Sequence, residues 1–212
     1  MRTDDLIAHL SGELEPAQGG ALTRQLILAL ASGLAISVIV MLSVLGLRPD
    51  FSAAMASFGM WIKLAYTFII AAFGFWLVER AGRPGASLAR PVLMLGIPML
   101  AIILLSAIQM GQPGADMHGL MMGHSSDVCA RNIVMVAAPT LLAAFWGLRR
   151  LAPTRLGLAG AGAGLFAGAA GAFVYAFHCT ESSAPFVAIW YTLGIALTAG
   201  IGAFLGRWAL RW

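Results

Sequence analysis

Six long apolar stretches constrain this chain more than any other feature of its sequence. Each is about 20 residues long, which at about 1.5 Å per residue matches the ~30 Å hydrocarbon core of a bilayer. Of the 212 residues, 60% are hydrophobic and only 10% are charged, too few to cover a soluble fold. A water-soluble enzyme, a free nucleic-acid-binding protein and a disordered chain are therefore excluded. The stretches occupy residues 26–47, 57–78, 91–110, 130–148, 156–177 and 184–205.

We therefore expect an all-α, polytopic membrane protein with six transmembrane helices. The first stretch is longer than the apolar part of a signal peptide, and four acidic residues precede it, so we expect it to be retained. The predicted organisation is a tail (1–25), a six-helix membrane domain (26–205) and a short C-terminal end (206–212).

Basic residues lie mainly on one side of the predicted membrane. That side has ten arginines, whereas the other has Arg48 and Arg131, with Lys63 inside the second stretch. Because cytoplasmic segments carry the excess of basic residues, both termini are predicted to be cytoplasmic. The ten arginines are at positions 2, 24, 80, 83, 90, 149, 150, 155, 207 and 211.

Glycines recur at a helical spacing in the fifth stretch. Gly160, Gly164 and Gly168 are four residues apart, which places them on one face of a helix. Gly202 and Gly206 repeat the spacing in the sixth stretch. Such faces let helix backbones approach closely, so this pattern predicts tight helix packing rather than a pore or hinge.

Lys63 is the one ionisable residue well inside a stretch. It lies near the outer end of the second stretch, and we expect its ammonium to reach outward to the membrane surface. A proton- or ion-coupled transporter normally needs acidic residues or a charge pair near the bilayer midplane. The sequence has none there, which argues against transport.

The only two cysteines, Cys129 and Cys179, fall on the outer side. One begins the fourth stretch and the other follows the fifth, so they can meet if these helices pack together. The outer side is oxidising, and a strained or exposed disulfide there would suit redox sensing. The alternative is two unrelated thiols at helix ends.

The loop 111–129 is rich in histidine and methionine. Imidazole and thioether groups suit Cu(I) or Zn(II), which makes His118, Met121 and His124 candidate metal ligands, with Cys129 as a further candidate. Their spacing matches no standard metal motif, so the alternative is a polar loop whose methionines dip into the interface. No other cofactor is expected.

The tail 1–25 contains a short amphipathic pattern. Thr3 can cap a helix whose first turn holds Asp4 and Asp5, where acids favour the positive end of the dipole. Because the segment is net acidic, an anionic lipid surface repels it, which favours docking into a groove on a protein. The alternative is an apolar face that rests on the bilayer. The predicted apolar stripe is Leu6, Ile7, Leu10 and Leu14.

These residues resemble those of a known family, the NrsF-type membrane anti-sigma factors. The start of the chain, from Met1 to Ile7, followed by Leu10, Leu14 and Pro16, is similar to the N-terminus of that family. Six spans and one cysteine in each of two periplasmic loops match as well. The resemblance implies a multi-pass protein of the bacterial inner membrane that holds an extracytoplasmic-function sigma factor there. It releases the sigma factor on oxidative or heavy-metal stress, with the cysteine pair implicated in sensing.

The predicted function is thus a non-enzymatic membrane anti-sigma factor, with the tail as the sigma-binding element and no direct contact with nucleic acid. One alternative is a metal or small-solute transporter that uses the His/Met loop as its entry. A second is a membrane thiol oxidoreductase, which two isolated cysteines fit poorly because such enzymes usually need a reactive CxxC or a quinone site.

Overall fold

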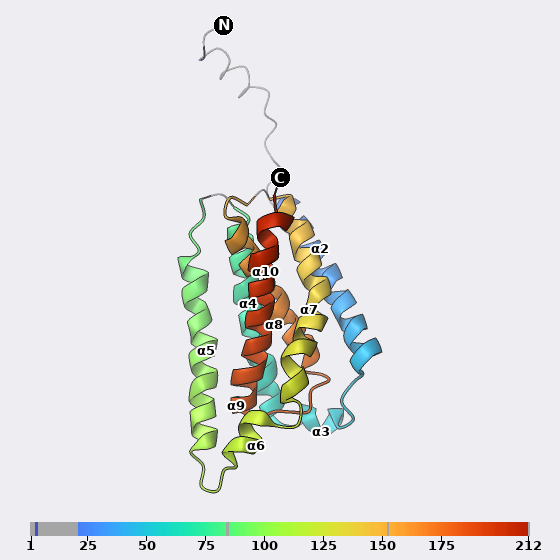
Figure 1. Ribbon diagram of the computed structural model, residues 1–212, viewed down its shortest axis with the longest axis vertical. Coiled ribbons are helices and arrows are strands. Elements are labelled where there is room, and N and C mark those ends of the chain that lie inside the picture. The colour runs from blue at the N-terminus through green and yellow to red at the C-terminus, as the bar shows by residue number, and fades with distance from the viewer. Residues whose placement is uncertain (1–2, 4–20, 84, 152, 212) are drawn as a thin grey trace.

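The computed structural model describes residue 3 and residues 21–83, 85–151 and 153–211, and every regular element in these ranges is helical (Figure 1). The predicted tail helix, apart from Thr3, lies outside the described residues. The elements are α2 (Ala21–Val40), η1 (Met41–Leu45), α3 (Phe51–Met55), α4 (Phe58–Ala81), α5 (Ala89–Met110), α6 (Met117–Met122), α7 (Ser126–Arg149), α8 (Leu156–Tyr175), α9 (Ala184–Phe186), η2 (Val187–Tyr191) and α10 (Thr192–Ala209).

Within the described ranges, six helices are long and apolar enough to cross a membrane, which agrees with the predicted number. The ends lie within about one helical turn of the predicted ones, except that α6 extends the fourth span. The first and last spans each contain a π-helical turn, η1 and η2. The spans are Thr23–Leu45, Phe58–Ala81, Ala89–Met110, Met117–Arg149, Leu156–Tyr175 and Ala184–Ala209.

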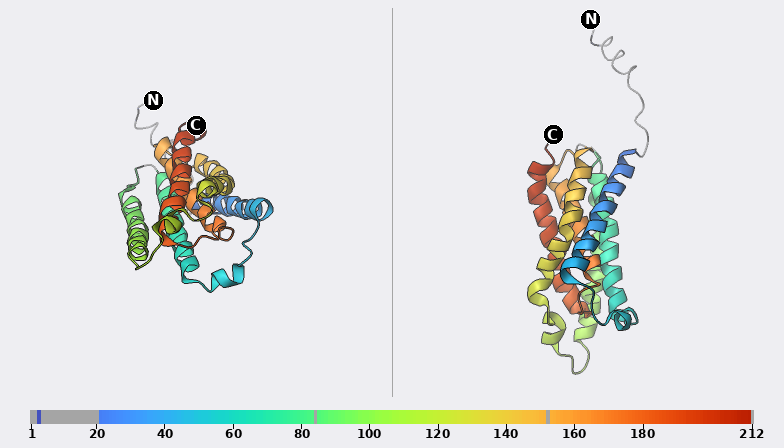
Figure 2. Two further views of the ribbon diagram at one scale, coloured as in Figure 1. Left: turned by 60° about the horizontal axis from the view of Figure 1, so that its bottom comes forward. Right: turned by 90° about the vertical axis from the view of Figure 1, so that its right-hand side faces the viewer.

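Helix α8 lies at the centre of the bundle and packs against α4, α7 and α10 (Figures 1 and 2). Helix α2 packs on α7 at one edge, and α5 packs on α4 and α9 at the other. This order follows from side-chain size, because α8 consists largely of glycine and alanine and is buried along most of its length. Small side chains let three neighbouring helices approach it at once.

The predicted glycine faces meet each other in the α8–α10 crossing. A Cβ atom on Gly160 would overlap the carbonyl oxygen of Gly202, and one on Gly206 would lie 2.8 Å from the Cα of Gly160. Backbone therefore lies directly on backbone in this crossing. The predicted close packing is confirmed.

Large apolar side chains cover the outside of the bundle, as expected where lipid is the solvent. Phe68, Leu93, Leu142 and Phe204 are examples from four different spans. The buried serine and threonine hydroxyls that the structure describes are hydrogen-bonded within the bundle, such as Thr198, which donates to the carbonyl oxygen of Gly194 at 2.8 Å.

The bundle has two ends that differ in charge. At the end that we call the terminal face lie the first residues of α2 and the last of α10 (Figure 1). The opposite end, which we call the cysteine face, holds α3, α6 and α9. Nine of the described arginines lie at or near the terminal face, namely Arg24, Arg80, Arg83, Arg90, Arg149, Arg150, Arg155, Arg207 and Arg211.

Substitution of Gly164 tests the α8–α10 crossing. A Cβ atom there would lie 2.7 Å from the Cα of Ala199 and overlap the carbonyl oxygen of Thr198. Overpacking of this kind costs about 1–3 kcal/mol, so Gly164→Ala should lower the midpoint of thermal unfolding in detergent. Gly200→Ala on α10 is the control, because its Cβ would meet nothing within 4 Å. Equal midpoints for the two variants would contradict the packing described here.

Candidate functional site

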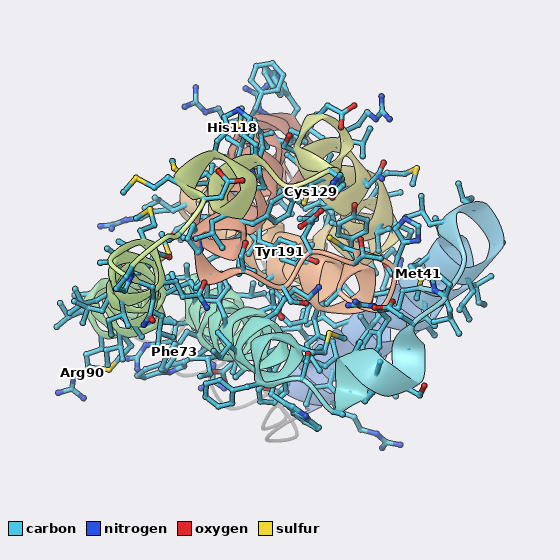
Figure 3. The ribbon with its side chains drawn as sticks, turned by 90° about the horizontal axis from the view of Figure 1, so that it is seen from below. Met41, Phe73, Arg90, His118, Cys129 and Tyr191 are labelled. Carbon is cyan, nitrogen blue, oxygen red and sulfur yellow. The ribbon has the colours of Figure 1, made fainter. Side chains whose placement is uncertain are left out.

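The two cysteines meet in the core beneath the cysteine face. Cys129 lies in the first turn of α7, and Cys179 follows the end of α8. Both are free and buried, and the two thiols lie beside each other, with Cys129 placed to donate toward the sulfur of Cys179. In the view onto this face, Cys129 and Tyr191 lie toward the middle of the bundle (Figure 3).

Packing of α7 on α8 produces this meeting. Gly171 of α8 lies so close to Ala137 of α7 that an added Cβ would be 2.8 Å from the Cα of Ala137. Beyond Tyr175 the chain continues as a turn, in which the backbone N–H of Cys179 donates to the carbonyl oxygen of Tyr175 at 3.0 Å. Cys179 is thereby held at the level of the first turn of α7.

Lys63 lies directly beside the pair. Its side chain is fully buried, and Nζ donates to the carbonyl oxygens of Cys179 at 2.9 Å and Glu181 at 2.7 Å. The expectation that this lysine reaches outward to the membrane surface is wrong. A buried ammonium needs acceptors, and the loop after α8 supplies two of them within the protein.

A second cation binds the same loop. Arg48 donates to the carbonyl oxygens of Cys179 and Thr180, each at 3.2 Å. Its guanidinium also forms a bidentate ion pair with the carboxylate of Asp50, with both N···O distances at 2.7 Å. These hydrogen bonds lower the pKa of Asp50 below its usual value. The carbonyl of Cys179 thus accepts from both Lys63 and Arg48.

Two buried tyrosines line the site. The rings of Tyr175 and Tyr191 have centroids 6.0 Å apart, and Nζ of Lys63 lies 5.6 Å from the centroid of the Tyr191 ring. The Tyr191 hydroxyl is fully buried, and it has no hydrogen-bond partner of regular geometry among the described residues. It lies close to Cys179 and favours negative charge on that sulfur.

The surroundings favour the thiolate form of Cys179. The hydrogen bond from Cys129 has the largest effect, and the charge of Lys63 adds to it, so the pKa of Cys179 is lowered from its ordinary value. The buried hydroxyl of Tyr191 and the backbone N–H of Glu181 act in the same direction. A lowered pKa makes a thiol more reactive at neutral pH, because the thiolate is the nucleophile.

The predicted metal ligands do not lie at this site. His118 and Met121 are exposed on α6, and His118 lies at the edge of the bundle (Figure 3). His124 is exposed, and its backbone N–H donates to the carboxylate of Glu181 at 2.8 Å. Within the described residues, no three His, Cys, Asp or Glu side chains are arranged to hold a metal ion. Metal binding by the histidine–methionine set stays a prediction.

Several residues of the site were not singled out for it by sequence. The sequence does not mark Arg48 or Tyr191 as site residues, and its pattern places the ammonium of Lys63 at the membrane surface. A usable signal exists for the cations, since they are two of the three basic residues on the outer side. Of the predicted partner-binding residues, the structure describes Thr3 alone, which is exposed.

The fold and the site define a class: a polytopic helical membrane protein with a buried pair of free thiols at one face. The sequence model of the family described as "Negative regulator of sigma F" matches residues 10–212. The chain therefore belongs to this NrsF family, and the resemblance inferred from the sequence is confirmed. The family is one of anti-sigma factors, which gives no support to the alternative of a transporter.

Two relatives match over their full length. The chain is 35% identical over 215 residues to the "Anti-sigma-F factor NrsF" of Caulobacter vibrioides, covering 100% of both chains. It is 34% identical over 214 residues to the "Probable anti-sigma-F factor NrsF" of Azospira oryzae, again covering 100% of both. No solved structure matches the chain.

Replacing Lys63 tests its role in holding the site. Lys63→Met leaves the carbonyls of Cys179 and Glu181 without this donor. Hydrogen bonds to charged groups contribute about 1.5–3 kcal/mol, so the unfolding midpoint in detergent should fall clearly. Arg83→Met is the control, because Arg83 is exposed and its pair with Glu79 is a surface ion pair. A loss no larger than that of the control would show that the buried bonds contribute little.

The lowered pKa of Cys179 predicts an unusual pH profile. At pH 6.5 an ordinary thiol with a pKa of about 8.5 is only about 1% thiolate, so alkylation is slow. Cys179 should still react rapidly with iodoacetamide there, and lose reactivity only as the pH falls through its lowered pKa. Cys129→Ala removes the main donor and should move the profile to higher pH. Mass spectrometry of the alkylated peptide measures both, and an ordinary profile in the parent protein would refute the prediction.

Proposed function

We propose that this protein is a membrane-bound anti-sigma factor that holds an extracytoplasmic-function sigma factor through residues 1–25. It releases the sigma factor when oxidative or heavy-metal stress acts on Cys129 and Cys179. The protein acts by binding rather than by catalysis. The observation that carries this proposal is the buried thiol pair, set at the opposite end of the bundle from the helix that leads into the tail.

The charge difference between the two ends supports an orientation. Nine described arginines lie at or near the terminal face, whereas Arg48 and Arg131 lie toward the cysteine face. The positive-inside rule favours a cytoplasmic terminal face. In a bacterial inner membrane the tail would then meet a cytoplasmic sigma factor, and the thiols would face the periplasm.

The amphipathic pattern of the tail supports its role as the binding element. The apolar stripe Leu6, Ile7, Leu10 and Leu14 can lie in a groove of the partner, and Asp4 and Asp5 favour the start of a helix. The membrane domain 26–205 then anchors this element, and residues 206–212 end the chain on the same side.

Helix α7 offers a physical connection between the two ends. It begins with the turn that carries Cys129 and packs along α2, which continues into the tail. The hydroxyls of Ser37 on α2 and Thr140 on α7 are 2.9 Å apart in a buried hydrogen bond. Near the terminal face, Leu26 of α2 lies against Gly147 of α7. A movement of α7 caused by the thiols would therefore act on the root of the tail.

Substitutions in the tail test the proposal directly. Leu6→Asp together with Leu10→Asp removes two apolar anchors, each contributing roughly 1.5–3 kcal/mol. Binding of the sigma factor should weaken by about two to four powers of ten, because 1.4 kcal/mol is tenfold. Asp4→Ala should act more weakly, through capping and charge. Co-purification with the sigma factor and a sigma-dependent reporter measure the effect.

A second experiment separates binding of the sigma factor from sensing of the stress. Cys129→Ser combined with Cys179→Ser should leave sigma binding intact and abolish the reporter response to oxidant or metal. Both variants must reach the membrane at the parental level, measured by immunoblot of membrane fractions. Full repression by the tail variant would overturn the role of the tail, and a normal stress response by the cysteine variant would overturn the role of the thiols.

A further inference from the structure

The two thiols of the pair differ in their access to solvent. A pocket of about 170 Å³ opens on the cysteine face beside Cys179. Cys129 is not among its lining residues and is 0% exposed, whereas Cys179 is 3% exposed and forms part of the wall. The hydroxyl of Ser125, also in the wall, lies 3.9 Å from the sulfur of Cys179. Of the two cysteines, a molecule that enters the pocket meets Cys179 and not Cys129.

The size of the pocket limits what can enter. Water occupies about 30 Å³ per molecule in the liquid, so the pocket holds a few waters or a molecule with a handful of non-hydrogen atoms. Hydrogen peroxide fits, whereas glutathione disulfide is far too large. Polar residues line part of the wall, including Arg48, His178 and Thr180, so a small polar molecule is accommodated.

The charged and titratable groups around Cys179 come from several elements. Lys63 of α4 and Arg48 of the first loop both bind its carbonyl oxygen. Cys129 of α7 donates to its sulfur, and the hydroxyls of Tyr175 and Tyr191 lie nearby. The carboxylate of Glu181 is turned to the backbone N–H of His124. Cations and donors therefore lie around Cys179, a setting that favours its thiolate form.

We propose that Cys179 is the thiol that reacts first, with a small peroxide-type oxidant admitted by this pocket, and that Cys129 is the resolving thiol. This inference rests on the proposed function, and it assigns the order of events within the pair. Lys63 and Arg48 act as positioning residues, since their hydrogen bonds fix the backbone of Cys179 in the wall of the pocket.

The chemistry balances in two steps. The Cys179 thiolate attacks one oxygen of hydrogen peroxide, the O–O bond breaks, and Cys179 becomes a sulfenic acid while hydroxide leaves and takes up a proton to form water. The sulfur of Cys129 then attacks the sulfur of Cys179, an S–S bond forms, and the S–O bond breaks with release of a second water. Two electrons pass from the two thiols to one peroxide.

Single serine variants of the full-length protein in detergent micelles test the order. With Cys129→Ser, the serine hydroxyl can still donate to Cys179, and the resolving thiol is absent. Brief exposure to hydrogen peroxide, followed by unfolding in dimedone so that the reagent reaches both positions, should label Cys179, as read by mass spectrometry. With Cys179→Ser, Cys129 should be labelled at least tenfold more slowly. Equal labelling of both, or faster labelling of Cys129, would overturn the proposal.

Narrowing the pocket tests the route of entry. Ser125→Val adds bulk to the wall and should slow peroxide-driven disulfide formation severalfold, whereas Ser126→Val, which lies outside the wall, should leave the rate unchanged. Glutathione disulfide should oxidise the parent protein far more slowly than peroxide does. Equal rates for the two valine variants, or a fast reaction with glutathione disulfide, would refute entry through the pocket.

These measurements need no sigma factor, so they separate the two proposals. If Cys179 is labelled first but the oxidised protein still binds its sigma factor, the proposed function fails while the reaction order stands. If the sigma factor is released on oxidation but Cys129 is labelled first, the reaction order fails alone. A folding defect is recognised because the single serine variants should elute as the parent does in size-exclusion chromatography.

Discussion

The close approach of α8 to its neighbours is the constraint on which the rest of this structure depends. In lipid, helices gain no hydrophobic stabilisation from one another, so contact between backbones and small side chains must hold the bundle together. The glycines of α8 bring α10 and α7 into such contact. Since Cys179 follows α8 directly and Cys129 begins α7, the same packing brings the two thiols together.

Two buried cations complete the site in a chain that has few charges. The end of a helix leaves carbonyl groups without intrahelical partners, and beneath a membrane surface these need donors from elsewhere. Arg48 supplies them: its backbone N–H donates to the carbonyl of Phe177 at 3.1 Å, and its side chain donates to the carbonyls of Cys179 and Thr180. The same loop supplies the acceptors for Lys63. The hydrogen bonds between the ammonium and these carbonyls compensate for the water that both groups lose on burial.

The sequence was informative for the features that the bilayer itself determines, namely the length of the spans and the close packing of helices. The lengths of the apolar stretches predicted the six spans, and the four-residue spacing of Gly160 and Gly164 predicted close helix contact. The interpretation of Lys63 failed because snorkelling assumes that the membrane surface is the nearest place with acceptors. Its true acceptors lie 116 and 118 residues away in the chain, and no local pattern reveals such partners.

The state of the thiol pair has a mechanical consequence for the proposed release. A disulfide requires a sulfur separation of about 2.05 Å, much shorter than the contact between two free thiols. Forming the bond therefore pulls the first turn of α7 and the loop after α8 toward each other. The loop is fixed by Lys63 and Arg48, whereas the first turn of α7 is bonded to neither cation. Because close-packed interiors transmit such displacements rather than absorb them, α7 is the element that should shift against α2, and α2 leads into the tail.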